Sequence, residues 1–259
     1  MVSIPVLETM GNAFKISPLL NVKDLSKLAG SRKIIERLNL TVSPGKIIGV
    51  FGENNSGREM IFDLLTGQLP PSSGHIVFKG EDVTALCSNA RQERGISCAM
   101  HPDQLFGELS ALENVLLLGG QSCRPFYPRA GGKSYTDDAM DLLKFVGLEH
   151  KADEQADRLS PFEQCLLTNA IALSCKPSLL LLDAPDMQTA VTRNAVFSLL
   201  KRIVKTGVTV MFTSQDRRQA IEICDKIVVF GEGGNTAKYR SSAMRADIAV
   251  TGGHEQYLQ

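Results

Sequence analysis

Two glycines, Gly52 and Gly57, stand between an apolar run and a helical pattern. Glycines in this arrangement let the backbone curl, so that several N–H groups and a helix N-terminus face one anion. Their spacing matches the frame G-x-x-x-x-G-K-[ST] of a loop that binds nucleotide phosphates. The sequence therefore predicts a phosphate-binding loop made of Gly52, Glu53, Asn54, Asn55, Ser56, Gly57, Arg58, Glu59 and Met60.

The end of this loop departs from the frame. Arg58 replaces the lysine, and Glu59 replaces the serine or threonine whose hydroxyl ligates magnesium. Arg58 keeps the positive charge, although a planar guanidinium does not substitute freely for an ammonium group. The Glu59 carboxylate repels phosphate, because two unit charges about 4 Å apart cost roughly 4 kcal/mol at an effective dielectric constant near 20. A glycine turn without a ligand, in which both residues are ordinary first-turn helix charges, is the alternative.

An acid ends a second apolar run, where residues 179–182 lead into Asp183. Buried parallel strands have this composition, and a carboxylate at such a strand end can ligate magnesium or cap a loop. A lone acid at a strand end, such as Asp183, is more often a loop cap than a catalytic group. Ser160, Pro161 and Glu163 have the order of a helix start: an N-cap serine, a first-turn proline and a glutamate three residues after the serine.

The elements that must position these groups alternate along the chain. Strands that alternate with helices indicate a parallel sheet covered on both faces. Two earlier strands are predicted within 19–42, around a turn at residues 29–31, and a short strand at 75–78. The remaining strands are expected at 47–51, 96–100, 179–182, 208–212 and 227–230. Helices are expected from Met60 to about Gly67, at 109–118 and 137–146, from Pro161, through 196–203 and over 217–223.

Composition excludes several classes of protein. The 259 residues are 43% hydrophobic, which is ample for a sizeable core. The chain has 28 Lys and Arg residues and 28 Asp and Glu residues. It therefore has no net positive charge that would attract nucleic acid or an anionic membrane. No apolar run approaches a membrane span, and the N-terminus lacks the pattern of a signal peptide. Six scattered cysteines without C-x-x-C spacing indicate buried thiols of a cytosolic protein, and four dispersed histidines indicate no metal site.

Several landmarks occur in one order: the glycine loop, a helical insertion, an L-S-x-x-x-Q segment, an apolar strand ending in Asp183, and another ending in Thr213-Ser214. This order resembles the nucleotide-binding subunit of an ABC transporter over about residues 19–253. Three shorter segments resemble family signposts in their expected places: Pro71-Ser72-Ser73-Gly74-His75-Ile76, Leu112-Glu113-Asn114-Val115 and Leu180-Leu181-Leu182-Asp183-Ala184-Pro185.

Within that family the chain looks most like the carbohydrate importers whose subunit carries two fused cassettes. Gly57-Arg58 resembles the G-R of their second cassette, and residues 249–253 resemble its tail. Branched-chain amino-acid importers are similar over the middle of the chain as well.

The resemblance also implies which working groups are replaced. Ala29 stands in place of the adenine-stacking aromatic, and His101 in place of the magnesium-sensing glutamine. Ala184 replaces the catalytic glutamate, Ala190 the aspartate of the next loop, and Gln215 the switch histidine. Asp183 matches the family's magnesium-binding aspartate, which makes it a further predicted nucleotide-binding residue. In the signature segment Leu159, Ser160 and Gln164 remain. Pro161 and Phe162 replace two glycines that let the helix approach a partner's γ-phosphate. We therefore assign no catalytic residue and no metal ligand, and we read His101 as a surface or lining residue.

The expected fold is α/β, with a P-loop NTPase (RecA-like) core around a parallel sheet, a β-rich N-terminal subdomain and an inserted helical subdomain. We expect an N-terminal tail at 1–18 and one nucleotide-binding domain at 19–259. Its core would comprise 19–103 and 158–235, its helical subdomain 104–157, and its C-terminal tail 236–259.

The resemblance implies a degenerate subunit of an ABC importer for a sugar or similar small solute. We expect a pseudo-ATPase that pairs with a second, active cassette and meets a membrane-spanning permease through its helical subdomain, near residues 101–114. ATP is expected to bind weakly or not at all, without well-ordered Mg2+. The subunit would be cytoplasmic, held at the inner face of the membrane by the permease, with no nucleic-acid partner. The alternatives are a slow but genuine ATPase subunit and a soluble regulatory or scaffold protein.

Overall fold

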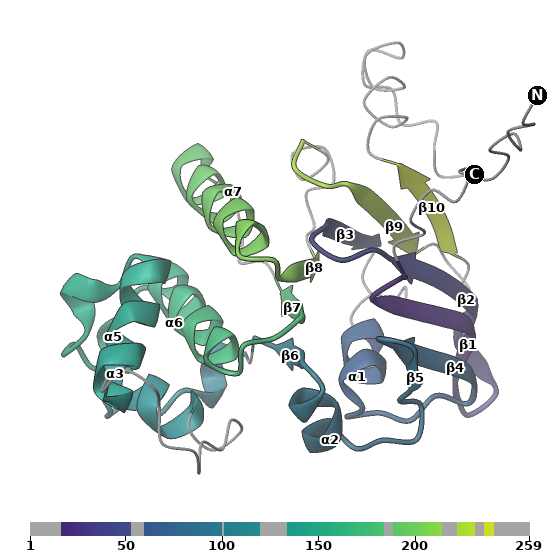
Figure 1. Cartoon of the computed structure of the whole chain (residues 1–259), viewed down its shortest axis with the longest axis horizontal. Coiled ribbons are helices and arrows are strands. Elements are labelled where there is room, and N and C mark those ends of the chain that lie inside the picture. The colour runs from purple at the N-terminus through teal and green to yellow at the C-terminus, as the bar shows by residue number, and fades with distance from the viewer. Residues whose placement is uncertain are drawn as a thin grey trace, which may run out of the picture.

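A computed structural model describes most of the chain (Figure 1). The described residues are 17–52, 60–99, 101–119, 134–183, 189–213, 222–230 and 236–240. The predicted N-terminal tail therefore lies almost entirely outside the described residues, as does most of the helix predicted over 217–223.

A mainly parallel sheet forms the centre of the fold. Its strand order in the described chain is β10-β9-β3-β8-β7-β6, and β10 alone runs antiparallel to its neighbour. Successive residues of β7 enter two different hydrophobic clusters, Leu179 and Leu181 one and Leu180 and Leu182 the other, because the strand is covered on both faces. The strands are β3 Ile47–Gly52, β6 Ile96–Cys98, β7 Leu179–Asp183, β8 Thr209–Thr213, β9 Lys226–Phe230 and β10 Thr236–Arg240.

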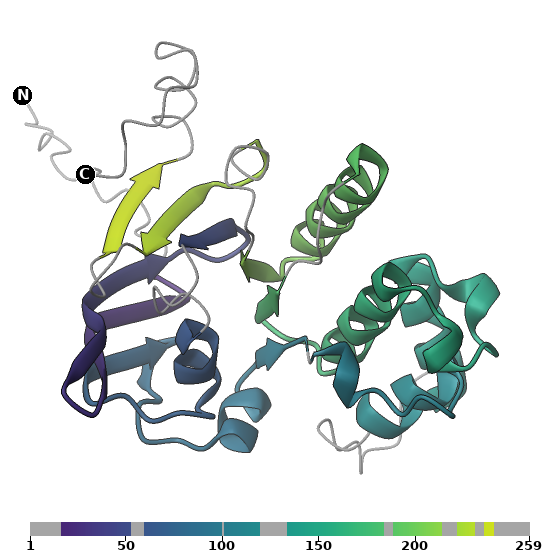
Figure 2. The ribbon, with the colours of Figure 1, turned by 180° about the vertical axis from the view of Figure 1, so that it is seen from behind.

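A second, antiparallel sheet covers one side of the first, as the two opposite views show (Figures 1 and 2). Its strand order is β2-β1-β4-β5. The buried residues of β1 and β2 pack with the short helix α1 and with one face of the parallel sheet in a single cluster. The bounds are β1 Leu20–Ala29, β2 Arg32–Val42, β4 Ser73–Phe78, β5 Glu81–Asp82, α1 Met60–Thr66 and α2 Ser88–Glu93.

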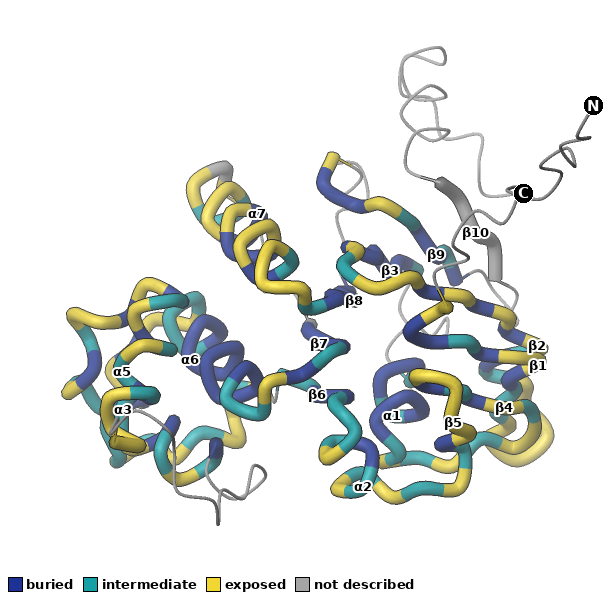
Figure 3. Tube along the Cα trace, viewed as in Figure 1, coloured by how far each residue is buried: buried dark blue, intermediate teal, exposed yellow. Residues whose placement is uncertain are grey.

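Helices gather on the other side of the molecule (Figure 1). Helix α6 is buried along most of its length, because α5 and a π-helical segment pack against it (Figure 3). The longer elements are α3 Ala111–Asn114, the π-helical segment Val115–Gly119, α5 Tyr135–Val146, α6 Pro161–Ser174 and α7 Ala190–Lys205. Three 3-10 turns connect them, at Pro102–Gln104, Glu149–Lys151 and Ala156–Arg158.

The structure confirms the expected fold class and adds elements that the sequence did not predict, among them β5, α2 and the 3-10 turns of the described residues. Residues 115–119 close a π-helix in place of the last turn of an α-helix, and residues 236–240 add an edge strand within the segment assigned to a C-terminal tail. Among the residues that the structure describes, no helix has both the length and the apolar character needed to cross a lipid bilayer.

Candidate functional site

Two described residues of the predicted site lie at the carboxyl edge of the parallel sheet, where open α/β sheets bind ligands. Thr213, the last residue of β8, pairs with Val50 of β3 and with Asp183 of β7. Gly52 ends β3 two residues beyond Val50, and Asp183 ends β7. The sheet therefore brings Gly52 and Asp183 to one edge, on strands separated only by β8.

Several predicted site residues lie outside the described part of the chain. These are Glu53, Asn54, Asn55, Ser56, Gly57, Arg58 and Glu59, together with Ala184 and Gln215. Met60 is described, and it begins α1 as predicted. Ile61, Leu64 and Leu65 are buried in the cluster beneath the antiparallel sheet, so the helix that follows the glycine loop is anchored by its apolar face.

The N-terminus of α6 carries the predicted cap. The Glu163 side chain accepts hydrogen bonds from the Ser160 backbone N–H and hydroxyl, each at 2.8 Å, and the Glu163 N–H donates to the Ser160 hydroxyl at 3.3 Å. Pro161 occupies the first turn, where its missing N–H costs nothing. This capping box satisfies donors that would otherwise face an incoming anion.

The charge at this helix end is negative. The Ser160 hydrogen bonds hold the pKa of Glu163 below its ordinary value, with a smaller contribution from Lys151 and His150. A phosphate near the Glu163 carboxylate would meet like charge, at a cost of roughly 4 kcal/mol for 4 Å and an effective dielectric constant near 20. The start of α6 therefore carries a capped N-terminus and a negative charge.

The other residues of the signature segment pack or hydrogen-bond within this chain. The Gln164 side chain donates to the Ala156 carbonyl at 2.9 Å and so fastens the segment before α6. Leu159 is buried, and half-buried Phe162 packs against the core at the place of the second family glycine.

His101 is exposed, with its Nδ1 atom 3.0 Å from Asp103 Oδ2, as expected of a surface residue. Ala29 is exposed at the end of β1 and offers no aromatic face.

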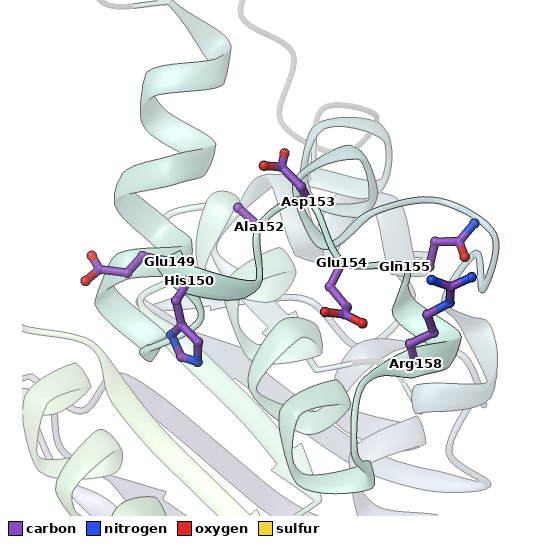
Figure 4. Close-up of a pocket in the computed structure, with 7 residues that line it drawn as sticks. All are labelled: Glu149, His150, Ala152, Asp153, Glu154, Gln155 and Arg158. Atoms are coloured by element: carbon purple, nitrogen blue, oxygen red, sulfur yellow. The ribbon is translucent and has the colours of Figure 1, made fainter.

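A hollow of about 600 Å3 lies outside the predicted site. It is lined by Glu149, His150, Ala152, Asp153, Glu154, Gln155 and Arg158, between α5 and α6 (Figure 4). None of these residues was predicted as functional. No group of three or more His, Cys, Asp or Glu in the described ranges is arranged to hold a metal ion.

Comparisons with known proteins agree with this architecture. The sequence model of the family described as "ABC transporter" matches residues 35–187. The lipopolysaccharide export system ATP-binding protein LptB of Escherichia coli (strain K12) is 27% identical over 218 residues, covering 83% of this chain and 87% of LptB. The ribose import ATP-binding protein RbsA 1 of Mesorhizobium japonicum is 26% identical over 227 residues, covering 87% of this chain and 44% of that protein.

A solved structure shares the fold. The crystal structure of a nucleotide-free ATP-binding cassette from an ABC transporter superposes with a TM-score of 0.78 at 22% sequence identity. The superposition covers 90% of this chain and 95% of that one.

Proposed function

The chain belongs to the ABC transporter family and has the fold of its ATP-binding cassettes, and from this premise we propose that it acts as a pseudo-ATPase. In this role it pairs with an active cassette and transmits movement to a membrane permease. The proposal extends to an importer of a sugar or similar small solute.

The observation that carries the proposal is the cap of α6. The Glu163 carboxylate accepts the N–H and hydroxyl of the N-cap residue Ser160, at a helix start that in the family pattern faces a partner's nucleotide phosphate. The replacement of the catalytic glutamate by Ala184 agrees with it, because alanine accepts no proton from an attacking water. Because the chain keeps the fold of the family but lacks its catalytic glutamate, a role in transmitting movement is favoured over a role in hydrolysis.

The importer assignment rests on the sequence pattern around Gly57-Arg58 and on the similarity to a ribose import protein. The relatives also include ATP-binding proteins of lipopolysaccharide export and of Nod factor export. The helices within 104–157 form the proposed permease-facing subdomain, with residues 101–114 as the contact. The subunit then sits at the inner face of the membrane, held there by the permease.

Equilibrium binding of labelled ATP to the purified chain tests the loss of nucleotide chemistry. Wild type is expected to show no saturable binding at micromolar ATP, because Glu59 stands where the family pattern has the hydroxyl residue of the phosphate-binding loop. Glu59→Thr is expected to strengthen binding, up to about a thousandfold if the full repulsion of roughly 4 kcal/mol is removed. Glu93→Thr, at an exposed glutamate on α2, is the matched control. Micromolar binding by wild type contradicts the proposal.

A slow but genuine ATPase is the second candidate. It is favoured by the placement of Gly52 and Asp183 at the same edge of the sheet, where a nucleotide and its magnesium would need them. Tight ATP binding by wild type, unchanged in Glu59→Thr, is the result that would select this candidate.

A further inference from the structure

Helix α6 connects the helical subdomain to the parallel sheet. It packs with α5 and the π-helical segment, and near its C-terminal end the Ala172 carbonyl accepts the hydroxyl of Ser97 in β6 at 3.1 Å. Helices α5 and α6 and the sheet share one hydrophobic cluster, which contains Leu143, Leu166 and Leu180. Apolar contacts are not directional, so packed helices can slide or rotate slightly against one another. A fixed orientation of α5 therefore needs a directional contact as well.

The last turn of α5 leaves a carbonyl for such a contact. Gly147, with φ of +92°, follows the helix, and its N–H donates to the carbonyls of Leu143 and Lys144 at 2.9 and 3.2 Å. The Leu148 N–H also donates to the Leu143 carbonyl, at 2.8 Å. This is the hydrogen-bond pattern of a Schellman motif. The Phe145 carbonyl comes next along the chain and is among the last four of the helix, which have no partner inside it.

Arg202 supplies a donor to this carbonyl from the last turn of α7. Its Nη2 group donates to the Phe145 carbonyl, and its Cζ atom lies 4.7 Å from the centroid of the Phe145 ring. The edge and the flat face of one guanidinium thus contact the same residue, which the ammonium group of a lysine cannot reproduce. The positive charge also lies at the negative end of the α5 dipole. These contacts favour one position for the end of α5.

The helix that carries Arg202 is itself fixed on the sheet. Five apolar side chains of α7 are buried in the cluster that contains Phe212 of β8: Val196, Phe197, Leu199, Leu200 and Ile203. Arg202 is exposed and stands next to Ile203 in the chain. It therefore links α5 to a helix that is anchored on the sheet.

We propose that Arg202 and Phe145 form a latch that holds the helical subdomain in one orientation relative to the sheet. Both residues belong to this chain, so the latch acts without nucleotide and without a partner. The inference goes beyond the proposed function and does not depend on it. A charge-assisted hydrogen bond and a cation–π contact together can change the ratio of closed to open latch by about tenfold. With the latch closed, a movement of α5 reaches α7 and the sheet as that of one rigid body.

The distribution of distances between two spin labels measures the orientation of the subdomain. Labels on non-canonical residues at positions 23 and 153, which are exposed on β1 and between α5 and α6, leave the native cysteines in place. Wild type is expected to give one narrow distribution, and Arg202→Ala a broader or shifted one. A broad distribution in wild type, or the same narrow distribution in Arg202→Ala, overturns the latch.

Amide hydrogen exchange of the full chain locates the effect. Arg202→Ala is expected to raise the exchange rates in the last turn of α5 about tenfold and to leave those of β7 and β8 unchanged. Arg202→Lys is expected to behave like Arg202→Ala, because it keeps the charge but loses the planar fork. Lys205→Ala, which removes a positive charge from the same turn of α7, is expected to match wild type. Equal increases in α5 and in the sheet, or an equal effect of Lys205→Ala, overturn the latch because they indicate a general loss of stability.

A double-mutant cycle tests whether the two residues act together. Phe145→Leu removes the ring but keeps an apolar side chain against the core and leaves the backbone carbonyl in place. It is expected to raise exchange in the last turn of α5 several-fold in the wild-type background. In the Arg202→Ala background it is expected to have little further effect, because the guanidinium is already absent. Increases that multiply in the double variant contradict the pairing of ring and guanidinium.

Discussion

Glu163 combines two effects in one side chain. It completes the cap of α6 through Ser160, and it leaves a negative charge at the positive end of the helix dipole. Both effects stabilise this chain in isolation, and both oppose the binding of a phosphate at the same place. Helix stability and nucleotide binding thus make opposite demands on this position.

The pH dependence of folding should reveal this cap. The Ser160 hydrogen bonds depress the folded-state pKa of Glu163 from its ordinary 4.5, so its stabilisation is fully present above pH 4.5 and disappears as pH falls through the lower folded-state value. Glu163→Gln is expected to lower the free energy of unfolding by about 0.5 kcal/mol at neutral pH, because the neutral amide keeps the hydrogen bond but loses the charge. The difference should vanish in acid.

Chemical denaturation at a series of pH values measures this difference. Glu93→Gln, the same change in the last turn of α2, controls for the general loss of a surface charge. A difference between wild type and Glu163→Gln that persists unchanged in acid would show that the carboxylate does not act through the cap.

At the scale of elements, Arg91 joins α2 to the end of α1. Its guanidinium is almost completely buried and donates to the carbonyls of Leu64 and Leu65 in the last turn of α1, at 2.6 and 3.0 Å. It also donates to Leu86 at 3.0 Å and to Thr84 at 2.8 Å. Burial lowers the pKa of Arg91, and the negative end of the α1 dipole favours its charge. This residue fixes the far end of the helix that follows the glycine loop.

Removal of this guanidinium should be costly. Arg91→Ala is expected to lower the free energy of unfolding by about 3 kcal/mol or more, because it leaves buried carbonyls without donors. Arg94→Ala, which removes a mostly exposed pair with Glu81, should cost less than about 1 kcal/mol. Denaturant titration measures the loss of unfolding free energy in Arg91→Ala and in Arg94→Ala. Equal losses would mean that the Arg91 hydrogen bonds contribute little.

The structure explains why position 74, within a segment that resembles the ABC family, is a glycine. Its φ angle is +90°, and a Cβ atom there would lie 2.4 Å from the Asp24 carbonyl oxygen of β1. Gly74→Ala is therefore expected to destabilise the antiparallel sheet by more than about 2 kcal/mol. Gly80→Ala, with φ of +84° and open space around it, should cost only the roughly 1 kcal/mol of the left-handed conformation. Thermal unfolding of Gly74→Ala and Gly80→Ala separates the cost of the clash with Asp24 from the cost of the left-handed backbone conformation.

The elements were predictable where their signal is local. Apolar runs predicted β3, β7, β8 and β9, and the order of Ser160, Pro161 and Glu163 predicted the cap of α6. The pairing of residues 107–112 with 152–157 was not predictable, because its hydrogen bonds join residues forty to fifty positions apart. The π-helical segment at 115–119 has an ordinary helical pattern in sequence, so its wider turn comes from packing.

At the scale of the whole molecule, the fold is that of an ATP-binding cassette while the groups expected to work on ATP are replaced. The sheet still delivers Gly52 and Asp183 to one edge, which follows from strand register and needs no ligand. The roles of residues 53–59 and of Ala184 stay predictions, since these positions lie outside the described residues. The proposed pseudo-ATPase would keep this architecture for its shape and its contacts.

Magnesium-dependent ATP turnover by the purified chain, compared with Ala184→Glu, tests this account most directly. We predict no turnover above background for wild type, because Ala184 cannot polarise water and Glu163 occupies the α6 N-terminus. Ala184→Glu alone should restore none, since Glu59 and Glu163 remain. Robust wild-type turnover that depends on magnesium and changes little in Ala184→Glu would contradict the assignment of a pseudo-ATPase.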